Sequence, residues 1–481
     1  MAEQTLKEKT AKGLFWGGLS NGVQQFLGMV FGIFLARILT VEDYGLVGML
    51  TIFIAIANSI SESGFTAALT NKPEFRHEDY NAVFWFNVIA ASFLYLVLFF
   101  VAPLIAAFFG RPELVSLSRV LFLTIVFGAL GTAHSAVLFR KLLVKERAKI
   151  DLTALILSGF VGVTLAFKGC SYWALAIQSL TYAGICMFLR WFYTPWRPTW
   201  QFHFSPIKEM FTFSVKILFT NMFGHINANI FTVLLGKFYN ATDVGLYSQG
   251  NKWMSMGYSA IGGMINGVAQ PVFAEVNGDK ERQVQVFRKM IRFAAFVSFP
   301  IMLGLAFVGE ELIFITVGEK WLPCVPILQL FCIWGAFCPI QLLYSQIVVA
   351  HGKSAFYLKS HIFIGCFQLL VAFSMLRLGV FWMVFANVLV NIIVWLSIWH
   401  WYVNQLIGIR LKNVVKDVFP YLIISLAIFI IVYVVTMQID NVYLLMISKI
   451  FLSAIAYCIL MWKGKSEIFN ESLSYLFRKK K

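Results

Sequence analysis

The chain has 481 residues, of which 59% are hydrophobic and 13% are charged, and its mean hydropathy is +0.77. Soluble domains carry about 45–50% apolar and about 25% charged residues, so this composition excludes a water-soluble fold and indicates a chain surrounded mainly by lipid. The formal net charge of +16 would suggest nucleic acid as a partner of a soluble protein, but in a membrane protein it first indicates basic cytoplasmic loops.

Fourteen mostly apolar segments are long enough to cross a bilayer, which takes about 20 residues in a helix. In chain order they are 14–35, 44–69, 82–109, 119–139, 150–167, 171–193, 211–235, 246–273, 293–316, 324–350, 358–377, 380–402, 418–437 and 442–462. The connections are short and contain no phosphate-binding glycine loop and no HExxH motif. We therefore predict an all-α integral membrane protein of about fourteen transmembrane helices that is not an enzyme and holds no cofactor or metal.

The basic residues indicate how the chain is oriented. If the N-terminus lies in the cytoplasm, the cytoplasmic segments hold 29 of the 39 Lys and Arg residues and the outer segments hold 7. Cytoplasmic loops of membrane proteins carry such an excess, so we predict that both termini are cytoplasmic. The basic inner surface would contact anionic membrane lipids. This accounts for the net charge without nucleic acid.

The first half of the chain is repeated in the second half. Residues 36–46 align with 236–246 at an offset of 200, which pairs Asp43 with Asp243 and Gly45 with Gly245. Because each copy holds an even number of spans, the copies would be parallel and would form a site between them. We predict two six-helix lobes around a central cavity, at 1–209 and 210–409, followed by two appended helices and a basic tail at 410–481.

Polar side chains share one face in the first two spans of each copy. They are Asn21, Gln24 and Gln25 in span 1, Asn58 and Glu62 in span 2, Lys216, Asn221, His225 and Asn229 in span 7, and Lys252, Ser255 and Ser259 in span 8. Polar side chains within spans usually face a bundle interior or a water-filled cavity, so we predict that these residues line a substrate path. The alternative is that they form hydrogen bonds between packed helices.

The charged residues within spans allow several interpretations. Glu62 could carry a coupling proton or cation, or form an ion pair with Lys216 or Lys252. If the two lysines face the cavity, they favour an anionic substrate such as a lipid pyrophosphate; otherwise they extend to the headgroups. Lys449 would extend in the same way or pair with another helix. The glutamates at 310 and 311 are expected at the water boundary.

Four short motifs are similar to those of a known family. They are Gly13-Leu14-Phe15-Trp16, Leu35-Ala36-Arg37-Ile38-Leu39 followed by Glu42-Asp43-Tyr44-Gly45, Ser63-Gly64-Phe65, and Gly318-Glu319-Lys320-Trp321. The sequence resembles the polysaccharide flippases of the multidrug/oligosaccharidyl-lipid/polysaccharide (MOP) exporter superfamily, in particular the branch that exports O-antigen, capsule or teichuronic-acid units. The resemblance covers essentially the whole chain.

The resemblance implies a flippase that moves undecaprenyl-pyrophosphate-linked oligosaccharides across the bacterial inner membrane by alternating access, coupled to an ion gradient of H⁺ or Na⁺. One alternative is a small-molecule or cation antiporter of the related drug-exporter branch, which would have twelve spans and acidic cavity residues. Another is a membrane-embedded glycan polymerase or ligase, which would carry a large outer loop rich in Arg and His.

Overall fold

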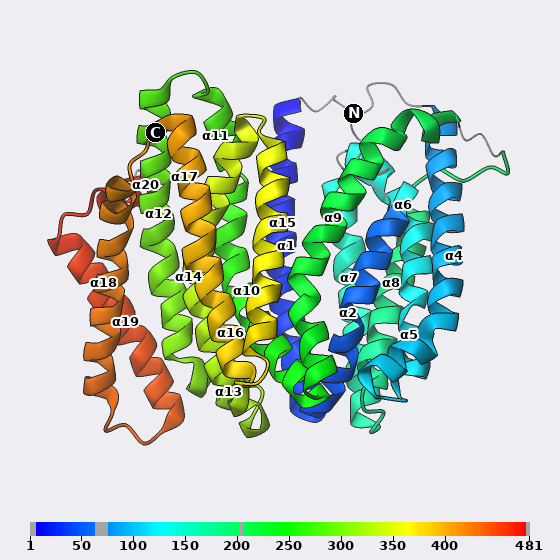
Figure 1. Cartoon of the computed structure of the whole chain (residues 1–481), viewed down its shortest axis with the longest axis horizontal. Coiled ribbons are helices and arrows are strands. Elements are labelled where there is room, and N and C mark those ends of the chain that lie inside the picture. Colours follow the sequence, from blue (N-terminus) through cyan, green and yellow to red (C-terminus); the bar gives the residue numbers. More distant parts are fainter. Residues whose placement is uncertain (1–5, 63–75, 142, 202–204, 478–481) are drawn as a thin grey trace. The chain divides into compact units, whose positions relative to one another are not determined.

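The computed structural model describes residues 6–62, 76–141, 143–201 and 205–477, and these residues form helices and connecting turns without a β-strand (Figure 1). The chain divides into two compact units, 1–245 and 246–481. The predicted all-α class is confirmed. The first unit extends beyond the predicted lobe 1–209, because it includes the seventh long helix, at Ser205–Phe238. The division into lobes at 209/210 and 409/410 stays a prediction.

The described residues of the first unit form eight helices and the beginning of a ninth. They are α1 (Leu6–Ile38), α2 (Val41–Glu62), α4 (His77–Phe109), α5 (Leu114–Leu121), α6 (Leu123–Arg140), α7 (Val144–Phe167), α8 (Trp173–Tyr193), α9 (Ser205–Phe238) and the first turn of α10 (Ala241–Asn266). Within this unit α1 packs along α7, α7 along α8, and α9 along α2. Leu35 of α1 and Leu39, just after it, meet Ala166 of α7 and Ala174 of α8 in one apolar cluster, where small residues let the helices approach closely.

The second unit continues from α10. It contains α11 (Ala269–Glu275), α12 (Lys280–Phe307), α13 (Gly309–Thr316), the 3₁₀ turn η1 (Glu319–Cys324), α14 (Val325–Ala350), α15 (Ser354–Met375), α16 (Val380–Leu389), the π-turn η2 (Val390–Val394), α17 (Trp395–Ile407), α18 (Leu411–Thr436), α19 (Val442–Lys463) and α20 (Glu467–Phe477). Helix α12 is central, with α14 and α18 packed along it. Helices α18 and α19, orange to red in Figure 1, lie side by side as the predicted appended pair.

Eleven helical segments of the described residues are long and apolar enough to cross a membrane. Three long helices outside that set, α1, α9 and α10, have 33, 34 and 26 residues and also match predicted spans. At a rise of about 1.5 Å per residue, each is longer than the roughly 30 Å hydrocarbon layer. The count of fourteen spans is therefore compatible with the structure. These three helices also carry ten of the twelve predicted path residues.

The duplicated motif forms matching helix starts. At the start of α2, the Thr40 hydroxyl accepts a hydrogen bond from the Asp43 amide at 3.2 Å, and the Asp43 carboxylate accepts one from the Thr40 amide at 2.8 Å. This reciprocal pair is a capping box. At the start of α10, the Asn240 side chain accepts from the Asp243 amide at 2.9 Å. The repeated aspartates thus mark equivalent helix N-termini.

The two starting turns also meet each other within the first unit. A methyl group on Gly45 would overlap the carbonyl oxygen of Ala241, and one on Gly245 would overlap the carbonyl oxygen of Val41. Each glycine therefore faces the first residue of the other helix. Such reciprocal contacts are the pattern that a two-fold relation produces. The absence of a side chain at both positions lets the two helix backbones touch.

The appended helices are held to the second unit by an apolar cluster. Ile428 and Val432 of α18 meet Tyr457 and Met461 of α19, and Phe296 of α12 packs against them. The Tyr457 hydroxyl donates to the Phe296 carbonyl at 2.8 Å. A hydroxyl in an apolar setting usually finds such a partner. The hairpin of α18 and α19 is therefore fixed to α12 at this level.

Candidate functional site

The predicted path residues of α1 lie near the middle of that helix. Asn21 and Gln25 are exposed, and the Gln24 side chain donates to the Ser20 hydroxyl at 2.8 Å. On α2, Asn58 is half-buried beside α6, where a methyl group on Gly128 would lie 3.9 Å from its Oδ1 atom. The side chain of Glu62 lies outside the described residues, so its predicted role stays a prediction.

The equivalent residues of α9 and α10 are placed in a similar way. Asn221 is exposed, whereas His225 and Asn229 are half-buried and the Asn229 amide donates to the His225 carbonyl at 2.9 Å. On α10, Lys252 is half-buried, Ser255 is exposed, and the Ser259 hydroxyl donates to its own helix at 2.9 Å. The side chain of Lys216 lies outside the described residues.

These hydrogen bonds bear on the two interpretations of the polar faces. The side-chain hydrogen bonds of Gln24, Asn229 and Ser259 all end on their own helices. Polar residues that join membrane helices would instead reach a neighbouring helix. These three hydrogen bonds therefore do not join two helices. Whether the twelve residues line one path stays a prediction.

A buried cluster of side-chain amides lies in the second unit, where the sequence analysis did not place one. The Gln341 amide of α14 donates to the Asn391 carbonyl at 2.6 Å, and the Gln368 amide of α15 donates to Asn391 Oδ1 at 2.9 Å. Asn391 donates to the carbonyl of Asn387 at 3.0 Å. Asn391 belongs to the π-turn η2, and π-turns occur often at functional sites. The amides join three helices around this turn.

A buried ion pair joins α13 to α19. Lys449 Nζ lies 2.5 Å from Glu311 Oε1, and the two side chains are 9% and 8% exposed. The same ammonium group lies 4.7 Å from the centre of the Phe307 ring, a distance typical of a cation–π contact. The pairing alternative for Lys449 is therefore confirmed. Glu310 is exposed, whereas Glu311 is buried because it is turned toward the appended hairpin.

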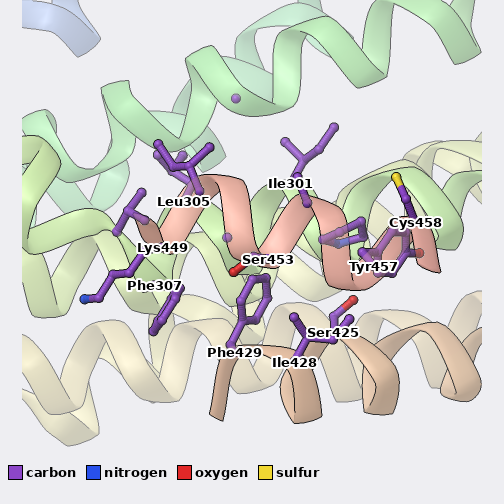
Figure 2. Close-up of a pocket in the computed structure, with 16 residues that line it drawn as sticks. Ile301, Leu305, Phe307, Ser425, Ile428, Phe429, Lys449, Ser453, Tyr457 and Cys458 are labelled. Atoms are coloured by element: carbon purple, nitrogen blue, oxygen red, sulfur yellow. The ribbon is translucent and has the colours of Figure 1, made fainter. Parts of the chain in front are cut away.

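Two cavities meet at Lys449. The first, of about 480 Å³, is apolar and lies between α12, α18 and α19. Figure 2 shows Lys449 at one end of it and Tyr457 and Cys458 at the other, with the lysine nitrogen pointing away from the cavity. The second, of about 560 Å³, is lined by α13 and the hairpin ends and includes Glu310, Glu311 and Lys449. The lysine stem therefore separates an apolar space from a charged one.

The opposite end of α12 is joined to the appended helices by charged residues. Arg288 makes two hydrogen bonds to the Asp417 carboxylate of α18, at 2.6 and 3.0 Å. Arg292 lies 2.7 Å from Glu467 of α20, and Lys289 reaches Glu471 of the same helix at 2.7 Å. Bidentate arginine–carboxylate contacts are strong and directional. The appended helices are thus tied to α12 at one end and to α13 at the other.

The arrangement of helices matches that of known transporters. A solved structure of the lipid II flippase MurJ in an inward closed conformation superposes with a TM-score of 0.70 at 15% identity, covering 96% of this chain and 99% of that one. An inward-facing multidrug resistance MATE family transporter of the MOP superfamily gives 0.64 at 17% identity, covering 79% and 94%. The chain therefore shares the fold of these two transporters, and it is a multi-pass membrane protein.

Sequence comparison identifies the family. A family model described as polysaccharide biosynthesis protein matches residues 34–326, which is more than half of the chain. The chain belongs to this family. It is also 25% identical over 361 residues to the teichuronic acid biosynthesis protein TuaB of Bacillus subtilis (strain 168), a match that covers 74% of both proteins. The resemblance drawn from the motifs is confirmed at the level of the family.

Proposed function

We propose that this protein is a flippase that moves a lipid-linked oligosaccharide from the inner to the outer leaflet of the bacterial cytoplasmic membrane. Three findings support the proposal: the family match, the relative named for teichuronic acid biosynthesis, and the fold shared with a lipid II flippase. The structural observation that carries it is the polar surface of α1 and α9, where amides are exposed on helices long enough to cross the membrane.

The chemistry of the predicted path suits a glycan attached to a pyrophosphate. Amide side chains such as Asn21 and Asn221 can both donate to and accept from sugar hydroxyls. Lys252, and Lys216 if it faces the same path, would neutralise the pyrophosphate. The undecaprenyl chain would remain in the bilayer while the head group crosses. No bond is made or broken in this process, so the protein acts as a transporter.

Transport against a glycan gradient requires an energy source. No nucleotide-binding motif occurs in the sequence, so the proposal couples transport to an H⁺ or Na⁺ gradient. Glu62 is the candidate ion-binding residue because it is a carboxylate within a predicted span. The distribution of Lys and Arg supports an orientation with both termini in the cytoplasm and the basic surface against anionic lipids.

The decisive experiment measures the leaflet in which a lipid-linked oligosaccharide resides. In cells depleted of the protein, the substrate should accumulate where an impermeant glycan-modifying reagent cannot reach it. In proteoliposomes of the full chain, an imposed H⁺ or Na⁺ gradient should accelerate its appearance on the opposite face. If depletion leaves the leaflet distribution unchanged and instead raises cellular drug accumulation, the antiporter alternative is correct.

Variants at equivalent positions of the two copies test the path. Asn21→Leu and Asn221→Leu should each lower the transport rate at least tenfold, because each removes hydrogen bonds from the same face of equivalent helices. Lys252→Met should lower it by a similar factor. Phe100→Leu is the control, since that side chain is 74% exposed on α4 and outside the path. Rates equal to wild type in the three path variants would contradict the assignment.

A further inference from the structure

The charged cavity at the α13 end of the hairpin is lined by Glu311, one of whose carboxylate oxygens has no hydrogen-bond partner among the described residues. Glu311 Oε1 accepts from Lys449, but Oε2 is buried and has no hydrogen-bond partner among the described residues. The side chain is 8% exposed. Buried polar atoms in proteins are nearly always hydrogen-bonded, and an ionised oxygen demands a donor most strongly. The cavity therefore calls for a ligand that donates a hydrogen bond to Oε2.

The charges of the cavity define the sign of that ligand. The described residues that line it include two carboxylates, on Glu310 and Glu311, and one cation, Lys449. Their formal sum is −1, so a ligand with one positive charge completes the balance. A primary ammonium group fits best, because it carries three N–H donors, whereas a quaternary ammonium group has none to offer Glu311 Oε2. An anionic head group would be repelled by the two carboxylates.

The neighbouring cavity indicates that the ligand also carries a hydrocarbon chain. The apolar cavity begins on the other side of the Lys449 stem and extends along α19 to Cys458 (Figure 2). Nine residues of helix correspond to about 14 Å. Its volume of about 480 Å³ lies in the range of ligand pockets. Ile301 and Ile450 on its rim are each 47% exposed, so the surrounding bilayer has access to it.

We propose that the two cavities together form a binding site for a phospholipid with a primary-amine head group, that is, a phosphatidylethanolamine. The ammonium group donates to Glu311 Oε2 and to Glu310. One acyl chain occupies the apolar cavity between α12, α18 and α19, and the phosphate remains at the water boundary. A bound lipid of this kind completes the contact between the appended hairpin and α13. This site is distinct from the proposed transport path and does not depend on it.

The test uses a series of lipids that differ in the number of N–H donors. Full-length protein is purified in detergent and equilibrated with phosphatidylethanolamine, its N-methyl and N,N-dimethyl derivatives, or phosphatidylcholine, all with the same acyl chains. Bound lipid is counted by native mass spectrometry. Retention should fall stepwise along the series, with about a tenfold difference between the first and last members. Phosphatidylglycerol should be retained no better than phosphatidylcholine.

Variants assign the lipid to this site. The pair Glu311→Gln with Lys449→Met removes both members of the ion pair, so no unpaired charge is left, and it should abolish the preference for the primary amine. Glu319→Gln is the control, because this exposed carboxylate follows α13 but does not line the cavity. Ser453→Phe fills the apolar cavity and should lower the retention of every lipid in the series alike.

Several outcomes would overturn the site. Equal retention of the ethanolamine and choline lipids would show that the carboxylates do not bind an ammonium group. A preference that survives in the double variant would place the lipid elsewhere. Displacement of the lipid by NaCl at constant ionic strength, but not by choline chloride, would mean that Na⁺ occupies the carboxylate oxygen. Normal lipid retention in Ser453→Phe would show that the apolar cavity does not hold the acyl chain.

Discussion

Removing the positive charge of Lys449 while leaving Glu311 in place should destabilise the second unit strongly. The perturbation is Lys449→Met, which keeps most of the apolar stem and removes only the ammonium group. Glu311 then retains a buried carboxylate that has lost its one described partner. Because the two side chains are 9% and 8% exposed, water cannot replace that partner without opening the hairpin.

The size of the effect follows from the geometry. Two unit charges 2.5 Å apart attract by about 6–7 kcal/mol at an effective dielectric constant of 20, before the desolvation of both groups is subtracted. Breaking a buried pair by removing one partner typically costs about 3–5 kcal/mol, whereas replacing both partners by uncharged groups is often nearly neutral. We expect about 3–5 kcal/mol for Lys449→Met and less than about 1.5 kcal/mol for the double variant with Glu311→Gln.

The assay is reversible unfolding of the purified full chain in mixed micelles, followed by tryptophan fluorescence. A double-mutant cycle with Glu311→Gln gives the coupling energy of the pair, which should be at least about 2 kcal/mol. Lys463→Met is the matched control, since this lysine is exposed at the other end of α19. A free energy of unfolding within about 1 kcal/mol of wild type for Lys449→Met would refute the reasoning.

Three further substitutions test other contacts in the same unfolding assay. Gly45→Ala should destabilise the chain by about 1–3 kcal/mol, because the added methyl group overlaps a backbone carbonyl. Gly28→Ala, which has open space around it, should not destabilise the chain. Equal effects of the two substitutions would disprove the close contact between the helix backbones. Gln341→Leu should cost about 1–3 kcal/mol, since a carbonyl of the π-turn loses its donor, and an unchanged stability would show that this carbonyl has another partner. Asp417→Asn should lower stability more at low than at high salt, because it removes the carboxylate partner of Arg288. Glu471→Gln, in a more exposed pair, should change stability by less than about 1 kcal/mol, and the reverse order would contradict the geometry.

The sequence predicted the spans well because a run of apolar residues is a local signal. It did not predict where spans are interrupted. The predicted span 293–316 breaks between Phe307 and Gly309, and the span 380–402 contains the π-turn at Val390–Val394. Neither interruption is marked by proline, while the prolines at 300 and 339 lie inside continuous helices. Packing against neighbouring helices decides these details, and packing is not visible in the sequence.

The candidate sites show the same limit. Asn387 and Asn391, one helical turn apart in an apolar run, were a visible sign of a buried polar cluster, but their partner Gln341 could not be inferred from spacing. Lys449 stood out as a charge within a span, yet its two possible roles could not be separated without knowing that α19 packs on α13. Long-range pairing must come from the fold, since many carboxylates could have served as the partner.

The separation of Glu311 and Lys449 along the chain also has a consequence for synthesis. The two residues are 138 positions apart. Chains grow at about 5–20 residues per second, so the lysine is made roughly 7 to 28 s after the glutamate. An unpaired Lys within a membrane helix carries a penalty of up to about 2.5–3.5 kcal/mol, which offsets much of the gain from the apolar residues of α19. The carboxylate already present on α13 reduces that penalty, so replacing Glu311 by Leu should lower the fraction of chains in which α19 spans the membrane.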